Sequence, residues 1–324
     1  SGGGATGTGG AAASCAPQQM ALGTAQRDGK TCAAGTGSEC FELTVSCPSV
    51  VDVHVQLRIT PAATGVANRG TVVFGTGGPG QGFYGSDYGL SAANMLSGLA
   101  ADGFQVIERS WVEGWIAGQT SMLASSCRYA TLIRWIYDNL HDQSTALCAS
   151  GNSGGSSEVS YALSRWNQET ILDLAVPTGG PPMGRMDIGC ADPTDPMVIE
   201  CENRLLPAGH NCTSLGCLYS RQGTTIDSAY SDTPCANREL DRLLCDSVVS
   251  PNGDFDYPQT KVHFVYGAND CGGGPGLGYY HYDAIVSDKE LTIAANTPHA
   301  VPSTSEGATA IQQAIENGCV MRHM

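Results

Sequence analysis

Charged residues are scarce in this chain, and lysine is the scarcest of them. Asp, Glu, Lys and Arg make up 15% of the 324 residues, and the chain contains only three lysines, Lys30, Lys261 and Lys289. The 31 acidic residues outnumber the 16 basic ones, which leaves a formal charge of −15. Because so acidic a surface repels phosphate backbones and anionic lipid headgroups, we expect neither nucleic acid nor an anionic membrane surface as a partner.

Long hydrophobic runs and metal-binding spacings are missing too. No run of 18 or more apolar residues occurs, so the sequence predicts no transmembrane segment. Paired CxxC and HxxxH spacings are also absent, and the nearest approach to a zinc motif is Cys212 and Cys217 with His210 close by. We therefore expect no metal and no cofactor.

Cysteine, by contrast, is abundant. The chain has 14 cysteines, an even number, and 41% of its residues are apolar, which is enough for a sizeable core. Without metal spacings, so many cysteines are typical of a disulfide framework formed in an oxidising compartment. The sequence therefore predicts an exported protein, although many pairings are compatible with the spacing.

The first 14 residues are small and lack periodicity, so we interpret them as a flexible linker ahead of a single domain over residues 15–324. They contain no charged segment followed by an apolar one, as expected if a signal peptide has been removed. The tract resembles the spacer of bacterial surface lipoproteins, whose lipidated cysteine would precede Ser1. We expect a secreted or extracytoplasmic protein, either free or held at the surface by a lipid upstream of Ser1.

Two hydrophobic periodicities organise most of the chain. Residues 41–47 and 51–59 alternate apolar and polar side chains, which predicts half-buried antiparallel strands. Helical patterns occur at residues 129–140 and after Ser303, which has capping-box spacing to Glu306. Short apolar runs predict further strands at residues 71–74, 104–107, 145–149, 171–176, 262–266 and 291–294. Strands that alternate with helices predict an α/β fold, with a mostly parallel central sheet and helices on both faces.

The segment from about 185 to 258 interrupts this alternation. It holds six cysteines and several prolines, and it shows no strand–helix repeat. A structureless loop of that length is improbable inside a compact domain. We therefore expect a disulfide-stapled cap with short helices, such as residues 238–245, over one end of the sheet.

A serine motif lies between a strand-like run and a helix-compatible stretch. Gly151, Ser153 and Gly155 match G-x-S-x-G, after residues 146–150 and before residues 156–166. On such a turn the serine adopts a strained backbone and its Oγ projects from the sheet, and the flanking glycines avoid a clash. The pattern indicates a nucleophile, and the alternative is an ordinary glycine-rich strand–helix turn.

A nucleophilic serine needs a base, an acid that orients the base, and donors for the oxyanion. Asp270 follows the predicted strand at 262–266, and His299 follows the predicted strand at 291–294. In parallel sheets the carboxyl ends of the strands line the functional crevice, which brings these residues to the side of Ser153. The remaining histidines are placed in strands (His54, His263), at a helix end (His141), in loops (His210, His281) or at the terminus (His323).

The glycine-rich segment at residues 75–82 follows another predicted strand. It has neither the GK[ST] ending of a P-loop nor the GxGxxG spacing, so a phosphate-binding role is disfavoured. A turn that exposes backbone N–H groups beside a nucleophile suits an oxyanion hole.

Taken together, residues 40–318 resemble the α/β-hydrolase superfamily, because the Gly151–Gly155 turn resembles its nucleophile elbow. Residues 77–80 read GGPG and resemble the HGGPG turn of the proline iminopeptidase-like branch, with Thr76 where that branch has histidine. The insertion also falls where this superfamily carries its cap. The resemblance implies that Ser153 is the nucleophile, Asp270 the acid and His299 the base. It also implies that the N–H groups of Gly78 and Gly154 form the oxyanion hole.

We therefore expect a secreted serine hydrolase that cleaves small-molecule or polymeric carboxylic esters, including a lipase or polyester hydrolase as subclasses. One alternative is a serine aminopeptidase whose cap residues Glu200, Glu202 and Asp241 bind the substrate amine. Another is an inert binding protein, although such proteins usually lack a triad residue. Aromatic residues after strand ends are candidates for either a substrate pocket or packing, at Trp111, Trp115, Tyr279, Tyr280 and Tyr282.

Overall fold

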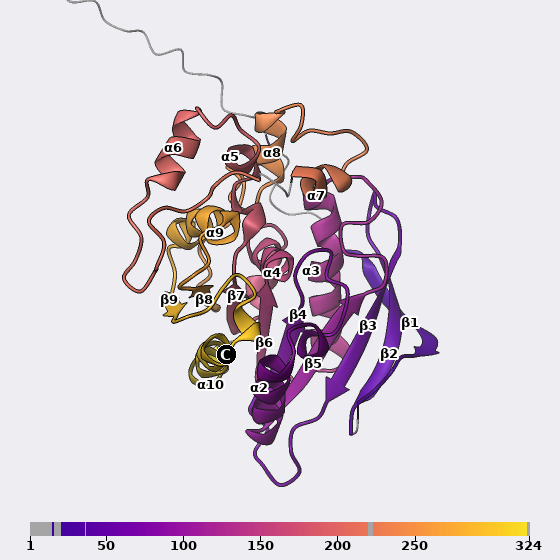
Figure 1. Cartoon of the computed structure of the whole chain (residues 1–324). Helices are drawn as coiled ribbons and strands as arrows, with labels where there is room; N and C mark the ends of the chain where they lie inside the picture. Colours follow the sequence, from indigo (N-terminus) through magenta and orange to yellow (C-terminus); the bar gives the residue numbers. More distant parts are fainter. Residues whose placement is uncertain (1–14, 16–20, 36, 220–222, 323–324) are drawn as a thin grey trace, which may run out of the picture.

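A computed structural model describes residues 15, 21–35, 37–219 and 223–322 of the protein. A nine-stranded sheet runs through it in the order β1-β2-β3-β5-β4-β6-β7-β8-β9 (Figure 1). The strands are β1 (Thr24–Thr31), β2 (Glu39–Ser46), β3 (Val53–Thr60), β4 (Gly70–Gly75), β5 (Phe104–Trp111), β6 (Ala146–Asn152), β7 (Leu174–Thr178), β8 (Lys261–Gly267) and β9 (Lys289–Ala294). The predicted linker at residues 1–14 lies outside the described residues.

The pairing of the strands follows the two periodicities of the sequence. Strands β1, β2, β3 and β5 pair antiparallel, and in β3 buried and half-buried side chains alternate. From β5 to β9 all pairs are parallel. Strands β4, β6 and β7 are buried along their whole length, which is why they have continuous apolar runs. The predicted mostly parallel sheet is confirmed.

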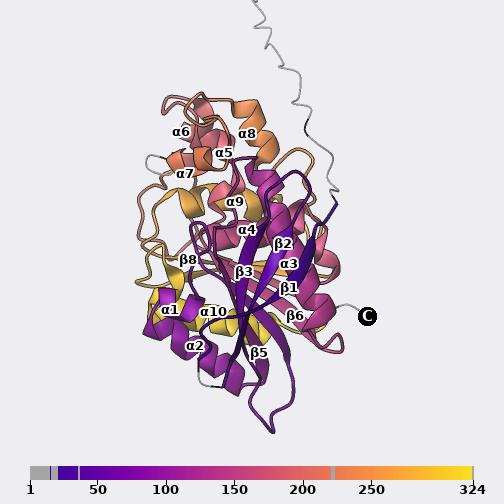
Figure 2. The ribbon, with the colours of Figure 1, turned by 90° about the vertical axis from the view of Figure 1, so that its right-hand side faces the viewer.

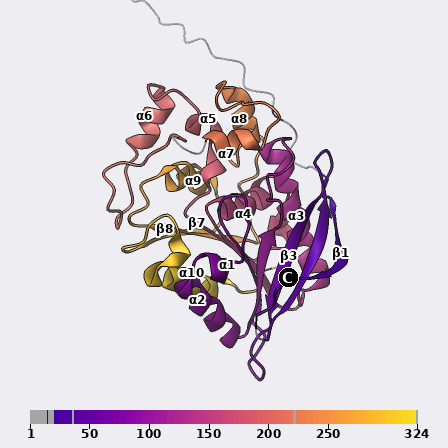
Figure 3. The same cartoon turned by 45° about the vertical axis from the view of Figure 1, so that its right-hand side comes forward.

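Helices cover both faces of the sheet (Figure 3). Helices α2 (Leu90–Ala101) and α10 (Ser305–Gly318) contact each other and share one hydrophobic cluster. Helices α3 (Met122–Asn139) and α4 (Gly154–Ser164) belong to a second cluster, which continues into α9 (Gly273–Ala284). The remaining short helices are α1 (Tyr84–Asp87), α5 (Met186–Gly189), α6 (Pro196–Glu202), α7 (Gly223–Ser228), α8 (Leu240–Asp246), η1 (Gln168–Thr170), η2 (Pro182–Gly184) and η3 (Val301–Ser303).

Two helix starts differ from the prediction. Helix α3 begins seven residues before position 129, at Met122, because the Ser121 side chain accepts a hydrogen bond from the Ala124 N–H at 3.0 Å. Helix α10 is capped by Thr304, whose Oγ1 accepts from the Gly307 N–H at 3.1 Å. The predicted capping box from Ser303 to Glu306 is therefore wrong, since Ser303 ends the preceding 3₁₀ turn.

Residues 185–258, which lie between β7 and β8 and which we call the cap, contain helices α5 to α8. They gather at the end of the molecule above α4 and α9 (Figures 1 and 2). Cys190–Cys235 and Cys201–Cys217 are disulfides within the cap. Cys15–Cys245 and Cys212–Cys271 tie the cap to segments outside it.

Three further disulfides join Cys32 to Cys40, Cys47 to Cys127 and Cys148 to Cys319. All 14 cysteines are thereby paired, and neither Cys212 nor Cys217 is available to ligate zinc. Among the described residues, no helix is both long and apolar enough to cross a membrane.

Candidate active site

Ser153 occupies a strained turn between β6 and α4. Its backbone has φ 54° and ψ −114°, a conformation that costs a non-glycine residue free energy and tends to mark functional sites. A Cβ on Gly151 would lie 2.3 Å from the Gly155 carbonyl oxygen, and a Cβ on Gly155 would lie 2.6 Å from the Gly75 oxygen. The turn can therefore be this tight only with glycine on both sides of the serine.

Asp270 and His299 reach Ser153 from the neighbouring loops. Asp270 follows β8 and His299 follows β9, so the carboxyl ends of the parallel strands bring the three residues together. His299 Nε2 lies 2.9 Å from Ser153 Oγ, and His299 Nδ1 lies 2.8 Å from Asp270 Oδ2. A carboxylate can only accept, so Nδ1–H donates to Asp270 and Nε2 is left to accept from the serine hydroxyl.

The pKa of His299 is set by two opposing effects. Burial of the imidazole lowers the pKa, whereas the hydrogen bond to Asp270 and its negative charge raise it. The effect of Asp270 prevails, and the pKa of His299 lies above its ordinary value. The Asp270 side chain itself is almost fully buried, so its charge acts on the imidazole with little screening by water.

The glycine turn (residues 77–80) lies directly beside the start of α4. A Cβ on Gly154 would lie 2.2 Å from Gly78 O and 2.9 Å from Gly78 N, so the two backbones are in close contact. Gly78 has φ 57°, in the left-handed region that favours glycine. Trp115 Nε1 donates to Gly78 O at 3.1 Å, and Gly77 N donates to Tyr88 Oη at 2.9 Å. The turn is thus held by side chains from two sides.

A buried ion pair supports the glycine turn from behind. Arg109 Nη1 donates to Gly80 O at 2.7 Å and Nη2 donates to Thr76 O at 3.1 Å. The same guanidinium pairs with Glu158 of α4, which also accepts from Trp111 Nε1 at 2.6 Å. Both charged side chains are fully buried. Burial raises the pKa of Glu158 to about 7, against the opposing effects of Arg109 and Trp111.

Sequence reasoning missed this pair, although one signal was present. Glu158 is the one charged residue in an eleven-residue helix that begins at the serine motif, and Arg109 lies in a strand that is buried along almost all of its length. Thr76, where the iminopeptidase-like branch has histidine, uses its hydroxyl to donate to Gln81 O at 3.1 Å within the turn.

A cavity of about 110 Å³ opens beside Ser153. Ser153, Gly78 and Gly154 form one side of it. Its other lining residues come from η2 and the cap, and they are Pro182, Met183, Tyr219, Thr225 and Ile226. Ser153 and the two expected oxyanion donors therefore face one small, mostly apolar space.

Other residues singled out from the sequence lie elsewhere. Glu200 and Asp241 are exposed on the cap helices, and neither they nor Glu202 line the cavity at Ser153. His281 is buried in α9, so its predicted loop position is wrong. Trp111 and Trp115 are buried and brace the site as described, while the aromatic residues Tyr279, Tyr280 and Tyr282 belong to α9 and do not line the cavity.

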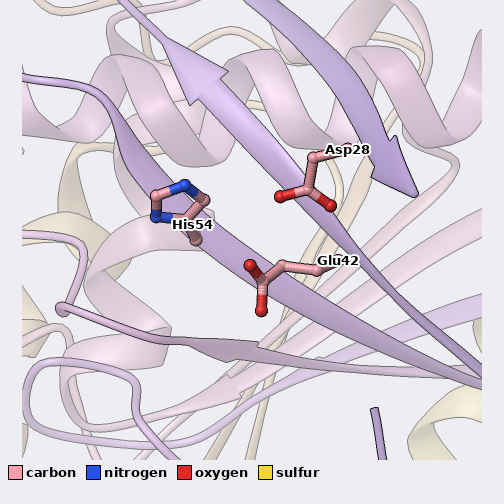
Figure 4. A group of neighbouring side chains, drawn as sticks. All are labelled: Asp28, Glu42 and His54. Atoms are coloured by element: carbon pink, nitrogen blue, oxygen red, sulfur yellow. The ribbon is translucent and has the colours of Figure 1, made fainter. Parts of the chain in front are cut away.

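One group of side chains on the antiparallel strands has the spacing of metal ligands. Asp28, Glu42 and His54 place one ligand atom each within 4.8 Å of one another (Figure 4). However, Lys30 Nζ lies 2.7 Å from Glu42 and 3.4 Å from Asp28, and His54 Nδ1 lies 2.8 Å from a Glu113 oxygen. An ammonium group of the chain thus already pairs with both carboxylates.

Comparison with solved structures identifies the fold. The chain is similar to esterase Est1E from Butyrivibrio proteoclasticus, with a TM-score of 0.52 and 10% identity over 87% of this chain and 98% of that chain. It is also similar to an acylaminoacyl peptidase from Pyrococcus horikoshii (TM-score 0.53, 9% identity, 89% of this chain, 42% of that chain). A third neighbour is a puromycin-hydrolyzing peptidase from Mycobacterium tuberculosis (TM-score 0.52, 14% identity, 87% of this chain, 39% of that chain). The fold is that of the α/β hydrolases.

The chain spans less than half the length of the two peptidases, whereas it covers nearly all of the esterase. No family model and no curated protein matches it. The predicted α/β-hydrolase fold is confirmed, while the proline iminopeptidase-like branch stays a prediction. In this α/β-hydrolase fold, Ser153 lies at the elbow between a central parallel strand and the helix that follows it.

Proposed function

We propose that this protein is an extracytoplasmic serine hydrolase that cleaves carboxylic esters through an acyl-enzyme on Ser153. The observation that carries the proposal is the hydrogen-bonded chain from Asp270 through His299 to Ser153, with distances of 2.8 and 2.9 Å. A serine, a base and an orienting acid in contact, beside backbone N–H groups, are the parts that acyl transfer needs.

The proposed reaction follows from this arrangement. His299 Nε2 takes the Ser153 proton as Oγ attacks the ester carbonyl, and Asp270 holds the tautomer and stabilises the imidazolium. The N–H groups of Gly78 and Gly154 donate to the developing oxyanion, each such donor lowering the barrier by about 3–4 kcal/mol. His299 then protonates the leaving alkoxide, and a water molecule hydrolyses the acyl-enzyme by the same route.

The surroundings of Ser153 favour an ester over an amino-terminal peptide. An aminopeptidase needs a carboxylate near the nucleophile for the substrate ammonium group. Among the residues that the structure describes, the cavity lining contains no charged side chain, and Glu200 and Asp241 lie on exposed cap positions. The inert alternative is disfavoured because all three triad positions are filled and in contact.

The disulfides support the location. Seven disulfides, with no free cysteine, are typical of a protein that folds in an oxidising, extracytoplasmic compartment. The proposed location has two variants: the protein is either released into the medium or attached to the surface through a lipid upstream of Ser1. Fractionation of cells that express the full precursor distinguishes them.

Replacing Ser153 by Ala tests the nucleophile. We expect loss of p-nitrophenyl ester hydrolysis and of labelling by a fluorophosphonate, with an unchanged melting temperature, because the exchange removes one hydroxyl from a side chain open to the cavity. Ser156→Ala is the matched control, since within the described residues that hydroxyl donates to the Ser153 carbonyl oxygen and not to the Ser153 hydroxyl. Undiminished turnover in Ser153→Ala would refute the assignment, and preferential cleavage of aminoacyl amides by the wild type would favour the peptidase.

A further inference from the structure

The cavity at Ser153 has a definite position relative to the two halves of an ester. The leaving oxygen must lie near His299 Nε2, because this nitrogen protonates it. The cavity is lined by Ser153 and by both expected oxyanion glycines, but not by His299. A group that enters it is therefore attached on the carbonyl side, away from the base, which makes it the acyl group.

The size of the cavity limits that group. An engineered apolar cavity of about 150 Å³ in another protein takes up benzene, which has six carbons. By the same ratio the cavity of about 110 Å³ at Ser153 holds about four carbons. The walls that the described part of the chain supplies are mostly apolar and include no charged side chain, so an uncharged aliphatic chain fits them better than a carboxylate or an ammonium group.

The walls of the cavity are anchored and cannot easily make room for more. Tyr219 donates from its hydroxyl to Pro182 O and receives support from its own N–H, which donates to Gly189 O at 2.8 Å. Met183 Sδ accepts from Ser157 Oγ at 3.0 Å. Both side chains are buried.

Ile226 closes the cavity from α7 and is 1% exposed. The next residue, Asp227, accepts from the Cys235 N–H at 2.7 Å, and Cys235 is bonded to Cys190. A disulfide in the cap thus holds the helix that supplies this wall.

We propose that this cavity is the acyl pocket and that it restricts the enzyme to esters of short, uncharged acyl groups of about two to four carbons. The proposal rests on the proposed function. The cap, through Tyr219, Thr225 and Ile226, is then the element that selects the acyl chain.

Chain length is the variable that tests this. For p-nitrophenyl acetate, butyrate, hexanoate and octanoate, which share one leaving group, we expect kcat/KM to fall at least tenfold between butyrate and octanoate. Ile226→Ala should raise the octanoate-to-butyrate ratio by about tenfold or more, and Ile226→Phe should lower the butyrate-to-acetate ratio. If the alanine variant does not fold, Ile226→Val takes its place. This exchange removes one methylene and should shift the octanoate-to-butyrate ratio in the same direction by a smaller factor. Ile199→Ala is the matched control, because Ile199 belongs to the same cap but is 47% exposed.

Inactivation by ethyl, butyl and octyl fluorophosphonates gives a second readout that does not depend on turnover. The wild type should react with the octyl reagent at least tenfold more slowly than with the ethyl one. Equal reaction with all esters and reagents, or an unchanged ratio in both Ile226→Ala and Ile226→Val, would overturn the acyl pocket while leaving the serine hydrolase intact. No reaction of Ser153 with any reagent or ester would overturn both.

Discussion

His299 shows most directly how single residues determine the chemistry. In the proposed mechanism its neutral imidazole accepts the serine proton, so the reaction requires the deprotonated form. Asp270 raises the pKa of His299 in spite of its burial. We therefore expect kcat/KM to rise with pH through one ionisation above the ordinary histidine value of about 6.5. Initial rates from pH 5 to 9 with an uncharged ester measure it, and a flat profile would exclude His299 as the base.

The raised pKa of His299 also makes the stability of the fold depend on pH. The folded state binds the proton of His299 more tightly than the unfolded state does, so the protonated pair stabilises the fold below about pH 6.5. This contribution is lost as the pH rises through the pKa of the folded state. Activity and this part of the stability therefore change in opposite directions over one pH window.

Asp270→Asn removes the negative charge that raises the pKa of His299, and it places an amide donor where only acceptors stood, so the tautomer is no longer fixed. We expect kcat to fall on the order of 10⁴-fold, as in comparable triads. Asp283→Asn is the matched control: Asp283 is half-exposed on α9 and pairs with Arg204, so its loss should change kcat less than twofold. A loss of only a few-fold in Asp270→Asn would assign the orienting role to another acid.

At the scale of elements, burial decides what could be predicted from the sequence. Strands β4, β6 and β7 are buried on both faces and were predicted from their apolar runs. Strand β1, with the sequence TAQRDGKT, was missed because it is exposed along most of its length and has no apolar alternation.

The site was predictable to a similar extent. Ser153, Asp270 and His299 each follow a recognisable strand, so topology brings them together. The cavity wall at Tyr219 and Ile226 belongs to cap helices too short for periodicity to reveal. The Arg109–Glu158 pair forms because two buried charges meet between β5 and α4. Their spacing along the chain does not reveal that contact.

The Arg109–Glu158 pair links strand β5, helix α4 and the glycine turn, and this link can be tested by mutation. Glu158→Gln leaves the Arg109 charge buried without a counter-ion, which costs about 3–5 kcal/mol of stability. The double variant Arg109→Met/Glu158→Leu removes both charges and should regain most of the melting temperature. Because the Thr76 and Gly80 carbonyls then lack their donors, we expect kcat to stay reduced at least tenfold with little change in KM. Full recovery of kcat in the double variant would show that the pair serves stability alone.

At the scale of the whole molecule, the disulfides connect parts that are distant in sequence. Cys15–Cys245 and Cys148–Cys319 span 230 and 171 residues, so they restrict the unfolded chain strongly. Cys212–Cys271 joins the cap to the residue after Asp270. Beside it, Gly216 N donates to Cys271 O at 2.7 Å and Asn211 N donates to Ala268 O at 2.8 Å. The cap therefore braces the loop that carries Asp270.

This arrangement predicts that the position of a disulfide matters more for activity than its number. Alkylation of the native protein without reductant should modify no cysteine, because all 14 are paired. Removal of Cys212–Cys271 by a double Ser variant should lower stability by about 2–5 kcal/mol and also lower kcat, since the Asp270 loop loses its brace. Removal of Cys32–Cys40, which closes a separation of eight residues at the exposed β1 edge, is the matched control and should leave kcat unchanged. Thermal unfolding and ester kinetics on the two variants measure both quantities. Equal kcat in the two disulfide variants would mean that the hydrogen bonds alone position Asp270. In the alkylation experiment, several modified cysteines in the native protein would contradict folding in an oxidising compartment.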